Sequence, residues 1–263
     1  MNVRDLFRLD GRVAFVSGAA GHLGRAMSTA LAEAGAHVIL NGRDDAKLEA
    51  FETELNSAGH SAERAAFDIT DSVALAKSIA RFPRLDIIVN NAISMTPRPW
   101  DALTASDFAL TYQSAVTAVF EIVRAARPAL KAAVKASGEA SIVNIASMYA
   151  NVSPDSRIYS SPAQASPLHY GPAKAALIQL TRHLAAELGA ECIRVNAIVP
   201  GPFPRREVSK RDPAFAERLA ARTMLGRTGE AREIAGPVLF LASRASGFVT
   251  GAAIPVDGGW TAW

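Results

Sequence analysis

Short runs rich in valine and isoleucine alternate along the chain with longer stretches whose apolar residues recur at helical spacing. Runs of this length bounded by Gly, Asn, Ser or Pro are typical of strands, and their near-continuous apolar character indicates a sheet covered on both faces. Regular alternation of such strands with helices predicts a doubly wound parallel α/β sheet of about seven strands, with helices on both faces. The expected strands are 12–18, 36–42, 61–69, 86–92, 141–147, 193–201 and 252–259, and the expected helices are 24–35, 45–59, 72–82, 105–134 and 174–188.

Length and composition restrict the class of protein. The 263 residues are 49% hydrophobic and 20% charged, which is typical of a globular chain that buries a full core. Neither a composition break nor a repeat divides the chain, so we expect a single domain over residues 1–263. No apolar run approaches the roughly 18 to 20 residues of a membrane span, and charges occupy the place of a signal peptide's apolar region. The single cysteine, Cys192, permits no internal disulfide or cysteine cluster, so we expect a cytoplasmic protein without a membrane partner or a bound metal.

The formal net charge of +3 is concentrated in one segment. From Arg205 to Glu233, eight basic residues stand against five acidic ones, which equals the whole excess. Interleaved charges of this kind indicate solvated helix faces, and no aromatic-rich basic stripe accompanies them. We therefore expect no nucleic-acid partner.

A glycine-rich turn, SGAAGHLG (17–24), follows the first expected strand and opens the first expected helix. Gly18, Gly21 and Gly24 permit a tight turn and let backbone N–H groups and the positive helix end approach a pyrophosphate. In this position the turn indicates a dinucleotide site on a Rossmann-like sheet rather than a bland loop.

The second expected strand ends in VILNGRD (38–44), without the Asp or Glu that normally binds the ribose 2′-hydroxyl of NAD. No carboxylate at that end repels a 2′-phosphate, and Arg43 can pair with one in a charge-assisted way. Arg25, just after the glycine turn, adds a second positive charge in this interpretation. The pattern favours NADP(H); NAD(H) stays open, because Asp44 or Asp45 can serve the ribose if the loop folds back.

Tyr170 and Lys174 stand four residues apart at the start of a helix striped with leucines. This separation puts both side chains on one face, so an ammonium can lie beneath a phenol. A free tyrosine has a pKa near 10, and a neighbouring ammonium favours the phenolate. Tyr170 is therefore a candidate proton donor to a carbonyl or acceptor from an alcohol, although Tyr-x-x-x-Lys alone also occurs by chance on helices.

Together with two C-terminal segments, these features make the chain resemble the short-chain dehydrogenase/reductase superfamily in its compact form, and the likeness covers nearly all of it. The segments that carry the resemblance, in the family's order, are SGAAGHLG (17–24), FDITD (67–71), NNA (90–92), Ser147 at the end of IVNIAS, Tyr170 with Lys174, RVNAIVPG (194–201) and PVDGGW (255–260).

The resemblance implies a catalytic set of three residues. Ser147 hydrogen-bonds the substrate oxygen, Tyr170 transfers the proton, and Lys174 binds the nicotinamide ribose while lowering the tyrosine pKa. The resemblance further implies a small-molecule carbonyl or alcohol substrate and a homotetramer or homodimer. The cofactor-binding residues in this interpretation are Gly18, Gly21, His22, Leu23, Gly24, Arg43, Asp68, Ile69, Asn91, Ala92, Tyr170, Lys174, Pro200 and Gly201.

Three positions depart from the family pattern. His22 stands where the middle glycine of the turn is usual, Ile93 stands where glycine is usual, and Ala115 aligns with the asparagine of the proton relay. On this alignment the relay is either broken or rebuilt by Ser114, Gln113 or water. The missing asparagine motivates an alternative from another class, a dinucleotide-binding sensor or scaffold with little catalytic turnover.

Ser147 and Tyr170 are 23 residues apart, about ten more than is usual in the family, so we expect an insertion at about 150–168. Its prolines and serines argue against a longer strand or helix, and its anchoring at two catalytic residues favours a pocket-forming role over a neutral surface loop. The opposite wall is expected in the variable loop at about 201–225. Candidate substrate contacts on the two walls are Met148, Tyr149, Arg157, Tyr159, Phe203 and Arg205.

These features predict an NADP(H)-dependent oxidoreductase that interconverts a ketone and a secondary alcohol by hydride transfer, with Tyr170 as acid and base. The arginines of the two loops suit a carboxylate, phosphate or polyhydroxylated substrate, with plain solvated arginines as the alternative. A polar ketone, sugar acid or polyol is expected, as in the gluconate 5-dehydrogenase-like members of the family, which this insertion resembles.

Overall fold

The computed structural model describes residues 2–161 and 164–263, so residues 162 and 163 of the expected insertion lie outside the described part. Its centre is one seven-stranded sheet, all parallel, in the order β3-β2-β1-β4-β5-β6-β7. This confirms the expected doubly wound α/β fold. The strands are β1 Val13–Val16, β2 His37–Gly42, β3 Ser61–Ala66, β4 Ile87–Asn90, β5 Ala140–Ile145, β6 Ile193–Pro200 and β7 Ala253–Val256.

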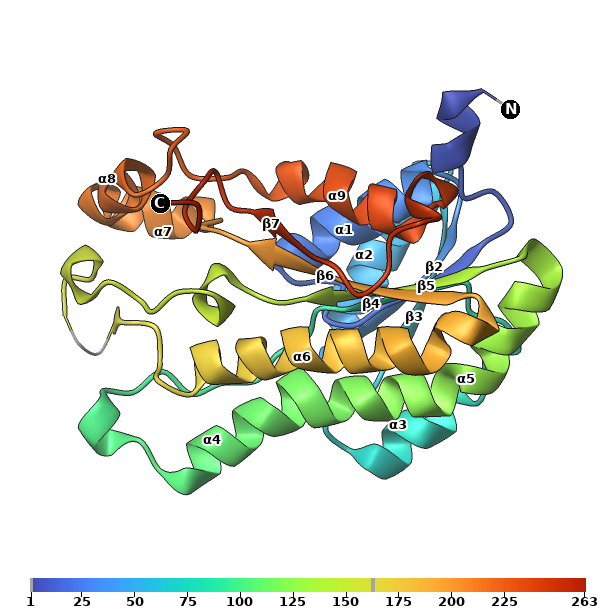
Figure 1. The fold of residues 1–263 in the computed structure, drawn as a ribbon, viewed down its shortest axis with the longest axis horizontal. Coiled ribbons are helices and arrows are strands. Elements are labelled where there is room, and N and C mark those ends of the chain that lie inside the picture. The colour runs from blue at the N-terminus through green and yellow to red at the C-terminus, as the bar shows by residue number, and fades with distance from the viewer. Residues whose placement is uncertain (1, 162–163) are drawn as a thin grey trace.

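Helices cover both faces of the sheet (Figure 1). In the described ranges, no helix combines the length and the apolarity needed to cross a bilayer. One face carries α1 His22–Glu33, α2 Asp45–Ser57 and α9 Ala235–Ala242; the other carries α3 Ser72–Ile79, α4 Ala105–Tyr112, α5 Ala118–Ser137 and α6 Tyr170–Leu188. Two short helices, α7 Arg206–Arg211 and α8 Pro213–Ala221, lie beyond the carboxyl ends of the strands, at the left of Figure 1.

Alternate residues of each strand enter two apolar cores. Ala14 and Val16 of β1 pack with the core under α1, α2 and α9, while Phe15 between them packs with the core under α3, α5 and α6. Each fully buried large side chain of this kind contributes about 1.5–3 kcal/mol. Because both faces are covered, the strands are apolar throughout, which explains the continuous apolar runs of the sequence.

The expected helix over 105–134 is divided by a π-turn, Gln113–Thr117, between α4 and α5. Such a turn takes one more residue than an α-turn and is frequent at functional sites. Ala115 lies in this turn and is 1% exposed, with Ser114 fully buried beside it. The Ser114 hydroxyl accepts a hydrogen bond from the Ser94 N–H (2.9 Å), which ties the segment after β4 to the turn.

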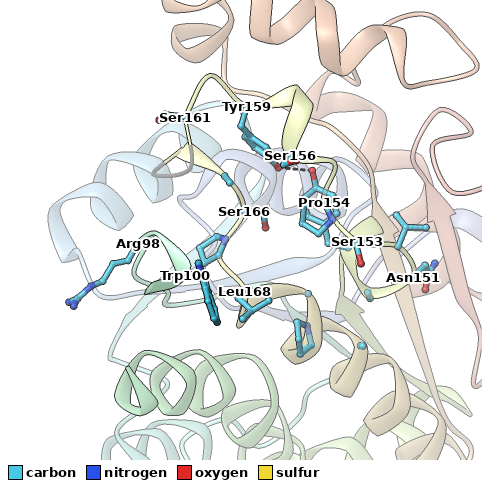
Figure 2. A pocket seen from close by; sticks show the side chains of 18 of the residues that line it. Arg98, Trp100, Asn151, Ser153, Pro154, Ser156, Tyr159, Ser161, Ser166 and Leu168 are labelled. Atoms are coloured by element: carbon cyan, nitrogen blue, oxygen red, sulfur yellow. Dashed lines mark hydrogen bonds between the residues drawn. The ribbon is translucent and has the colours of Figure 1, made fainter. Parts of the chain in front are cut away.

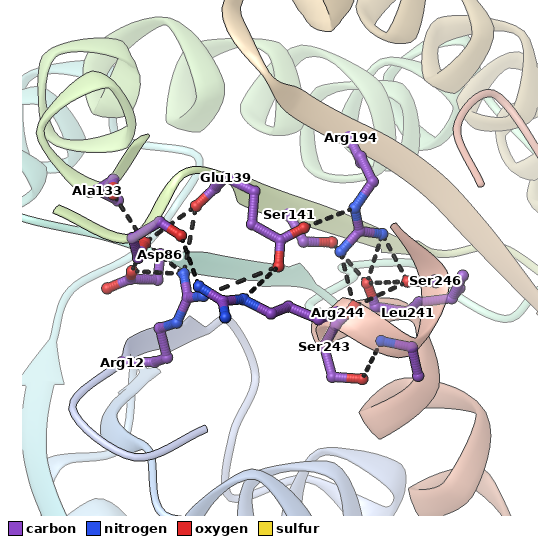
Figure 3. A network of polar contacts seen from close by, with 12 residues as sticks. Arg12, Asp86, Ala133, Glu139, Ser141, Arg194, Leu241, Ser243, Arg244 and Ser246 are labelled. Atoms are coloured by element: carbon purple, nitrogen blue, oxygen red, sulfur yellow. Dashed lines mark hydrogen bonds and ion pairs between the residues drawn. The ribbon is translucent and has the colours of Figure 1, made fainter. Parts of the chain in front are cut away.

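A network of arginine and acidic side chains closes the amino-terminal end of the sheet (Figure 3). The buried carboxylate of Asp86, just before β4, accepts a hydrogen bond from Arg12, just before β1 (3.1 Å). Glu139, just before β5, lies 3.8 Å from Arg12 and Arg244 and 3.3 Å from Arg194. Ion pairs satisfied on both sides in this way fix where the strands begin, at the end of the sheet opposite the glycine turn.

Candidate active site

Ser147, Tyr170 and Lys174 meet where β5 ends and α6 begins. The Ser147 hydroxyl accepts a hydrogen bond from the Tyr149 N–H (3.2 Å) and lies close enough to the Tyr170 hydroxyl to lower its pKa. The Lys174 ammonium donates to the Ile145 carbonyl (2.6 Å) and lies 5.9 Å from the centroid of the Tyr170 ring. One turn of helix therefore brings the amine alongside the phenol, as the spacing of four predicts.

Burial governs the acidity of both groups. It lowers the pKa of Lys174 from its ordinary 10.5 to about 8, because the side chain, 3% exposed, holds its charge away from water. Burial also raises the pKa of Tyr170 above its ordinary value, while the hydrogen bond with Ser147 acts in the opposite direction. In the protein alone the pKa of Tyr170 is therefore raised, whereas the neighbouring Lys174 was expected to lower it. A phenol of raised pKa stays protonated at neutral pH, as donation to a carbonyl requires.

A cavity of about 320 Å³ opens beside the start of α1, at the carboxyl ends of β1, β2 and β4. Nine predicted cofactor residues line it: Gly18, Gly21, His22, Leu23, Arg43, Asp68, Ile69, Asn91 and Ala92. Gly24 lies under the turn instead, and Pro200 and Gly201 lie at the end of β6 outside this lining. Lining residues that the sequence did not assign to the cofactor are Asn41, Gly42, Phe67, Ile93, Ser94 and Arg205.

The glycine turn is packed too closely to admit a side chain at Gly18 or Gly24. Gly18 has a φ of +65°, and a Cβ on it would lie 2.9 Å from the Asn91 amide nitrogen. A Cβ on Gly24 would lie 2.1 Å from the Gly18 carbonyl oxygen. The start of α1 has no side-chain cap, and His22 Nε2 is buried without a partner among the described residues. Open backbone, an uncapped helix start and a free ring nitrogen fit the diphosphate of a dinucleotide.

The two arginines that the sequence proposed for a 2′-phosphate differ in their surroundings. Arg43 lines the cavity and is largely exposed, 3.8 Å from Asp68. Arg25 pairs with Glu54 (2.5 Å) and lies over the Phe51 ring, 4.1 Å from its centroid. Both partners of Arg25, Glu54 and Phe51, lie on α2, and Arg25 does not line the cavity. The expectation that Arg25 adds charge to the cavity is therefore wrong.

The substrate candidates of the inserted loop separate into two groups. The hydroxyls of Tyr149 and Tyr159 lie 2.6 Å apart, and burial raises the pKa of both phenols. Met148 is 5% exposed and packs in an apolar cluster with Trp260. The Arg157 side chain is 85% exposed and forms two hydrogen bonds with the carboxylate of the nearby Asp155, so it points to solvent.

The two candidates of the variable loop also lie apart. The Phe203 ring occupies the space above Gly229, where a Cβ would lie 2.4 Å from it, and packs against the core under α1. Arg205 lines the cavity of the glycine turn. The structure thus places neither residue against the inserted loop.

Contacts between the inserted loop and α8 join the two walls directly. The Arg218 guanidinium donates to the Ile158 carbonyl (2.6 Å) and to the Ser160 hydroxyl (3.0 Å). The rings of Tyr159 and Phe215 lie 5.8 Å apart between their centroids. The inserted loop is therefore packed against α8 rather than extended into solvent.

A cavity of about 780 Å³ lies between the inserted loop, the segment before α4 and the first turns of α6 (Figure 2). Its surface is mainly carbon, from side chains such as Trp100, Pro154 and Leu168, interrupted by the hydroxyls of five serines. In Figure 2 the guanidinium of Arg98 extends away from it. Neither Ser147 nor Tyr170 lines this cavity, but Tyr149, Tyr159 and Gly171, which neighbour Tyr170, lie on its wall.

A buried histidine that the sequence interpretation passed over braces the start of α6. His169 is fully buried, and its Nδ1 lies 3.0 Å from the Thr111 hydroxyl on α4. Its Nε2 lies 3.3 Å from the Thr96 carbonyl, which can only accept, so this nitrogen carries the proton. His169, the residue before Tyr170, thereby ties the start of α6 to α4, which is followed directly by the π-turn. The one feature of the sequence that could have drawn attention to His169 is its position directly before Tyr170.

The fold, the glycine turn and the arrangement of Ser147, Tyr170 and Lys174 all indicate the same class of protein. Residues 18–261 match a family model described as enoyl-(acyl carrier protein) reductase. The chain belongs to the short-chain dehydrogenase/reductase family and is an oxidoreductase of CH–OH and carbonyl groups with NAD(P) as the cofactor.

Relatives within that family include sugar and polyol dehydrogenases. Gluconate 5-dehydrogenase of Gluconobacter oxydans is 34% identical over 99% of both chains, and the L-tagatose-forming galactitol 2-dehydrogenase of Cereibacter sphaeroides is 37% identical over 100% of both. A solved gluconate 5-dehydrogenase from Burkholderia cenocepacia, in complex with NADP and tartrate, superposes with a TM-score of 0.87 at 30% identity and 100% coverage of both chains. The likeness to these proteins extends over 99–100% of the chain.

Proposed function

We propose that the protein interconverts a polar ketone and the corresponding secondary alcohol with NADP(H), using Tyr170 as the acid and base. The observation that carries the proposal is the meeting of three side chains at one point: the Ser147 hydroxyl lies beside Tyr170 and lowers its pKa, and Lys174 is one helical turn away and buried. No other tyrosine in the described residues has a lysine at this position.

Each of the three side chains has a distinct task. When bound, NADP(H) supplies the hydride for reduction and takes it up in oxidation. Tyr170 gives its proton to the carbonyl oxygen, or receives one from the alcohol, and Ser147 stabilises the charge that develops on that oxygen. Lys174 binds the ribose of the cofactor and, from one turn away, stabilises the phenolate that Tyr170 becomes. The nearness of the Ser147 and Tyr170 hydroxyls supports this assignment because one substrate oxygen can accept hydrogen bonds from both.

NADP(H) is the proposed cofactor because the end of β2 offers a 2′-phosphate a cation and no free carboxylate. Arg43 lines the cavity at this point. Asp44, the next residue, caps α2 through the Lys47 N–H (3.1 Å) and pairs with the Lys47 ammonium (2.6 Å). This arrangement argues against the alternative in which Asp44 binds an NAD ribose. The NADP complex of the Burkholderia cenocepacia relative supports the same choice.

The proposed substrates are polar ketones of the sugar-acid or polyol type. Relatives named for gluconate and galactitol support this class, as do the serine hydroxyls on the wall of the larger cavity. We also propose a homotetramer or homodimer in the cytoplasm. Exposed apolar side chains on the outer helical layer, Leu110 (39%) and Phe120 (44%), support self-association.

Replacing Tyr170 by phenylalanine tests the mechanism, with Tyr112→Phe as a matched control on α4. Steady-state rates on a panel of sugar acids, polyols and their ketones with NADP and NADPH are compared with NADPH affinity from fluorescence titration. We expect Tyr170→Phe to lower kcat at least about 100-fold with an unchanged NADPH Kd, because one acid–base group is lost. Equal rates for wild type and Tyr170→Phe on a substrate that turns over would refute the assignment.

A further inference from the structure

The helix that carries Tyr170 begins directly after the inserted loop, and His169 is its N-cap residue. We propose that His169 is a positioning residue of the reaction, which acts through Tyr170 by fixing the first turn of α6 against α4. The inference rests on the proposed function, in which Tyr170 is the acid and base. It assigns an effect on the catalytic rate to a buried side chain outside the three proposed for catalysis.

The side chain of His169 turns to α4 instead of capping its own helix. Its Nδ1 lies 3.0 Å from the Thr111 hydroxyl, and its Nε2 donates to the Thr96 carbonyl (3.3 Å). Its ring meets the Phe108 ring edge-on, with 5.7 Å between the centroids. Because His169 and Thr111 are fully buried, removing one partner leaves the other as an unsatisfied buried polar group.

Tyr170 lies between two anchored neighbours. On one side is His169, and on the other Gly171 lies so close to the Tyr149 carbonyl that a Cβ on it would be 2.7 Å from that oxygen. Tyr149 is itself tied to the catalytic centre, because its N–H donates to the Ser147 hydroxyl (3.2 Å). The first turn of α6 is thus held near the serine by Gly171 and against α4 by His169. Losing the contacts of His169 releases one of these two sides.

The partners of His169 are in turn held by the segment after β4. The Thr111 hydroxyl lies 3.3 Å from the Ser94 carbonyl, which also accepts a hydrogen bond from the Ser114 hydroxyl in the π-turn (3.1 Å). The Ser94 N–H donates back to the same Ser114 hydroxyl (2.9 Å). The position of Tyr170 is therefore set from a network that reaches the π-turn, two segments away in the sequence.

Proton transfer depends steeply on this position. The Tyr170 hydroxyl must reach the substrate oxygen beside Ser147 at hydrogen-bond distance, and a displacement of about 1 Å can lower a rate about 100-fold. Dinucleotide binding depends on the glycine turn at the start of α1, to which the contacts of His169 do not extend. We therefore expect a loss of these contacts to lower kcat and to leave the NADPH Kd unchanged.

Steady-state rates on a substrate that turns over, together with NADPH titration by fluorescence, test this role. His169→Phe keeps a ring against Phe108 and removes both polar contacts, so kcat should fall about 10- to 100-fold, with the ketone KM and the NADPH Kd within about twofold of wild type. His169→Asn should recover part of the rate, because its side-chain oxygen can accept from Thr111. Thr111→Val removes the same link and should also lower kcat. The control is His183→Phe, at an exposed position of the same helix, which should leave kcat unchanged.

Two double variants separate a positioning role from a general structural one. His169→Phe combined with Thr111→Val should be no slower than His169→Phe alone, because both changes break one link. In single-turnover measurements with NADPH, His169→Phe should not slow a Tyr170→Phe protein further, since a residue that acts through the phenol then has nothing to act on. A general defect of the site would lower both rates by the same factor.

Three results would overturn the inference and leave the proposed function intact. They are a wild-type kcat in His169→Phe, an NADPH Kd that weakens in parallel with kcat, and an undiminished effect of His169→Phe in the Tyr170→Phe protein. If His169→Phe does not fold, Thr111→Val decides, and a wild-type kcat in that variant overturns the inference. Equal rates for wild type and Tyr170→Phe would instead overturn the proposed function, and the inference with it.

Discussion

Replacing Lys174 by methionine should stabilise the protein at neutral pH while removing the amine that we propose for catalysis. Burial lowers the pKa of this lysine to about 8, so the folded state disfavours the charged form, whereas the unfolded chain has the ordinary value of 10.5. Between these two pH values the unfolded chain binds more protons than the folded protein. The stability of the wild type should therefore rise with pH across the window from about 8 to 10.5.

The size of the effect follows from that pKa difference. At pH 7 the buried charge costs the wild type about 3 kcal/mol, and at pH 10 about 1 kcal/mol, because most of the lysine is then neutral in the folded state. Methionine fills a similar volume without a charge but leaves the Ile145 carbonyl without the donor that Lys174 provides, at a cost of about 1 kcal/mol. The net expectation is a gain of about 2 kcal/mol at pH 7 and no gain at pH 10.

Urea denaturation of both proteins, followed by tryptophan fluorescence at pH 7, 8, 9 and 10, measures this difference directly. A variant that is less stable than wild type at pH 7, or a difference that does not change with pH, would refute the reasoning. A well-hydrated Lys174 with its ordinary pKa in the folded protein gives the second result. Loss of oxidoreductase activity in Lys174→Met is expected at every pH, and it separates the gain in stability from any gain in function.

Two further substitutions test the ends of the sheet. Asp86→Asn removes the buried carboxylate that pairs with Arg12 and Arg84 and should lower the free energy of unfolding by about 3–5 kcal/mol in urea, because the largely buried Arg12 then keeps only the more distant Glu139 at 3.8 Å. A loss below about 1 kcal/mol would show that solvent reaches this network. Gly24→Ala places a Cβ 2.1 Å from the Gly18 carbonyl oxygen and should weaken NADPH at least tenfold in titration, whereas Gly236→Ala in α9, with no atom within 4 Å of its Cβ, should leave the affinity unchanged. Equal affinities would show that the turn can shift.

The fold was predictable because its signals are local and repeated. Continuous apolar runs at regular spacing leave a parallel sheet covered on both faces as the only arrangement that buries them all. The π-turn at Gln113–Thr117 could not be predicted, because nothing in the residues 105–134 interrupts the helical period. It follows from tertiary contacts, in which Ser114 holds the backbone of Ser94.

The site was predictable where one motif fixes the geometry, and unpredictable where two segments distant in sequence must meet. The spacing of Tyr170 and Lys174 determines their relation on a helix. The position of Arg205 depends instead on how the chain leaves β6 and packs Phe203 above Gly229, which no local pattern encodes. Charge alone placed Arg205 with Arg157, although Arg205 lines the cavity of the glycine turn and Arg157 pairs with the nearby Asp155.

The two ends of the sheet differ in how they satisfy buried polar groups, and this difference accounts for where the site can lie. At the amino end, the Asp86 carboxylate is fully paired, and Arg84 Nε is the one buried side-chain atom without a partner among the described residues. At the carboxyl end, His22 Nε2, Asn41 Oδ1 and Asn90 Oδ1 are buried without partners among the described residues, and Lys174 holds a buried charge. Each unsatisfied group costs about 1–3 kcal/mol, so an edge that collects several of them persists only where packing elsewhere outweighs the cost. The same groups are the ones a polar ligand can satisfy, so binding strength at this edge and instability of the unliganded edge have one physical origin.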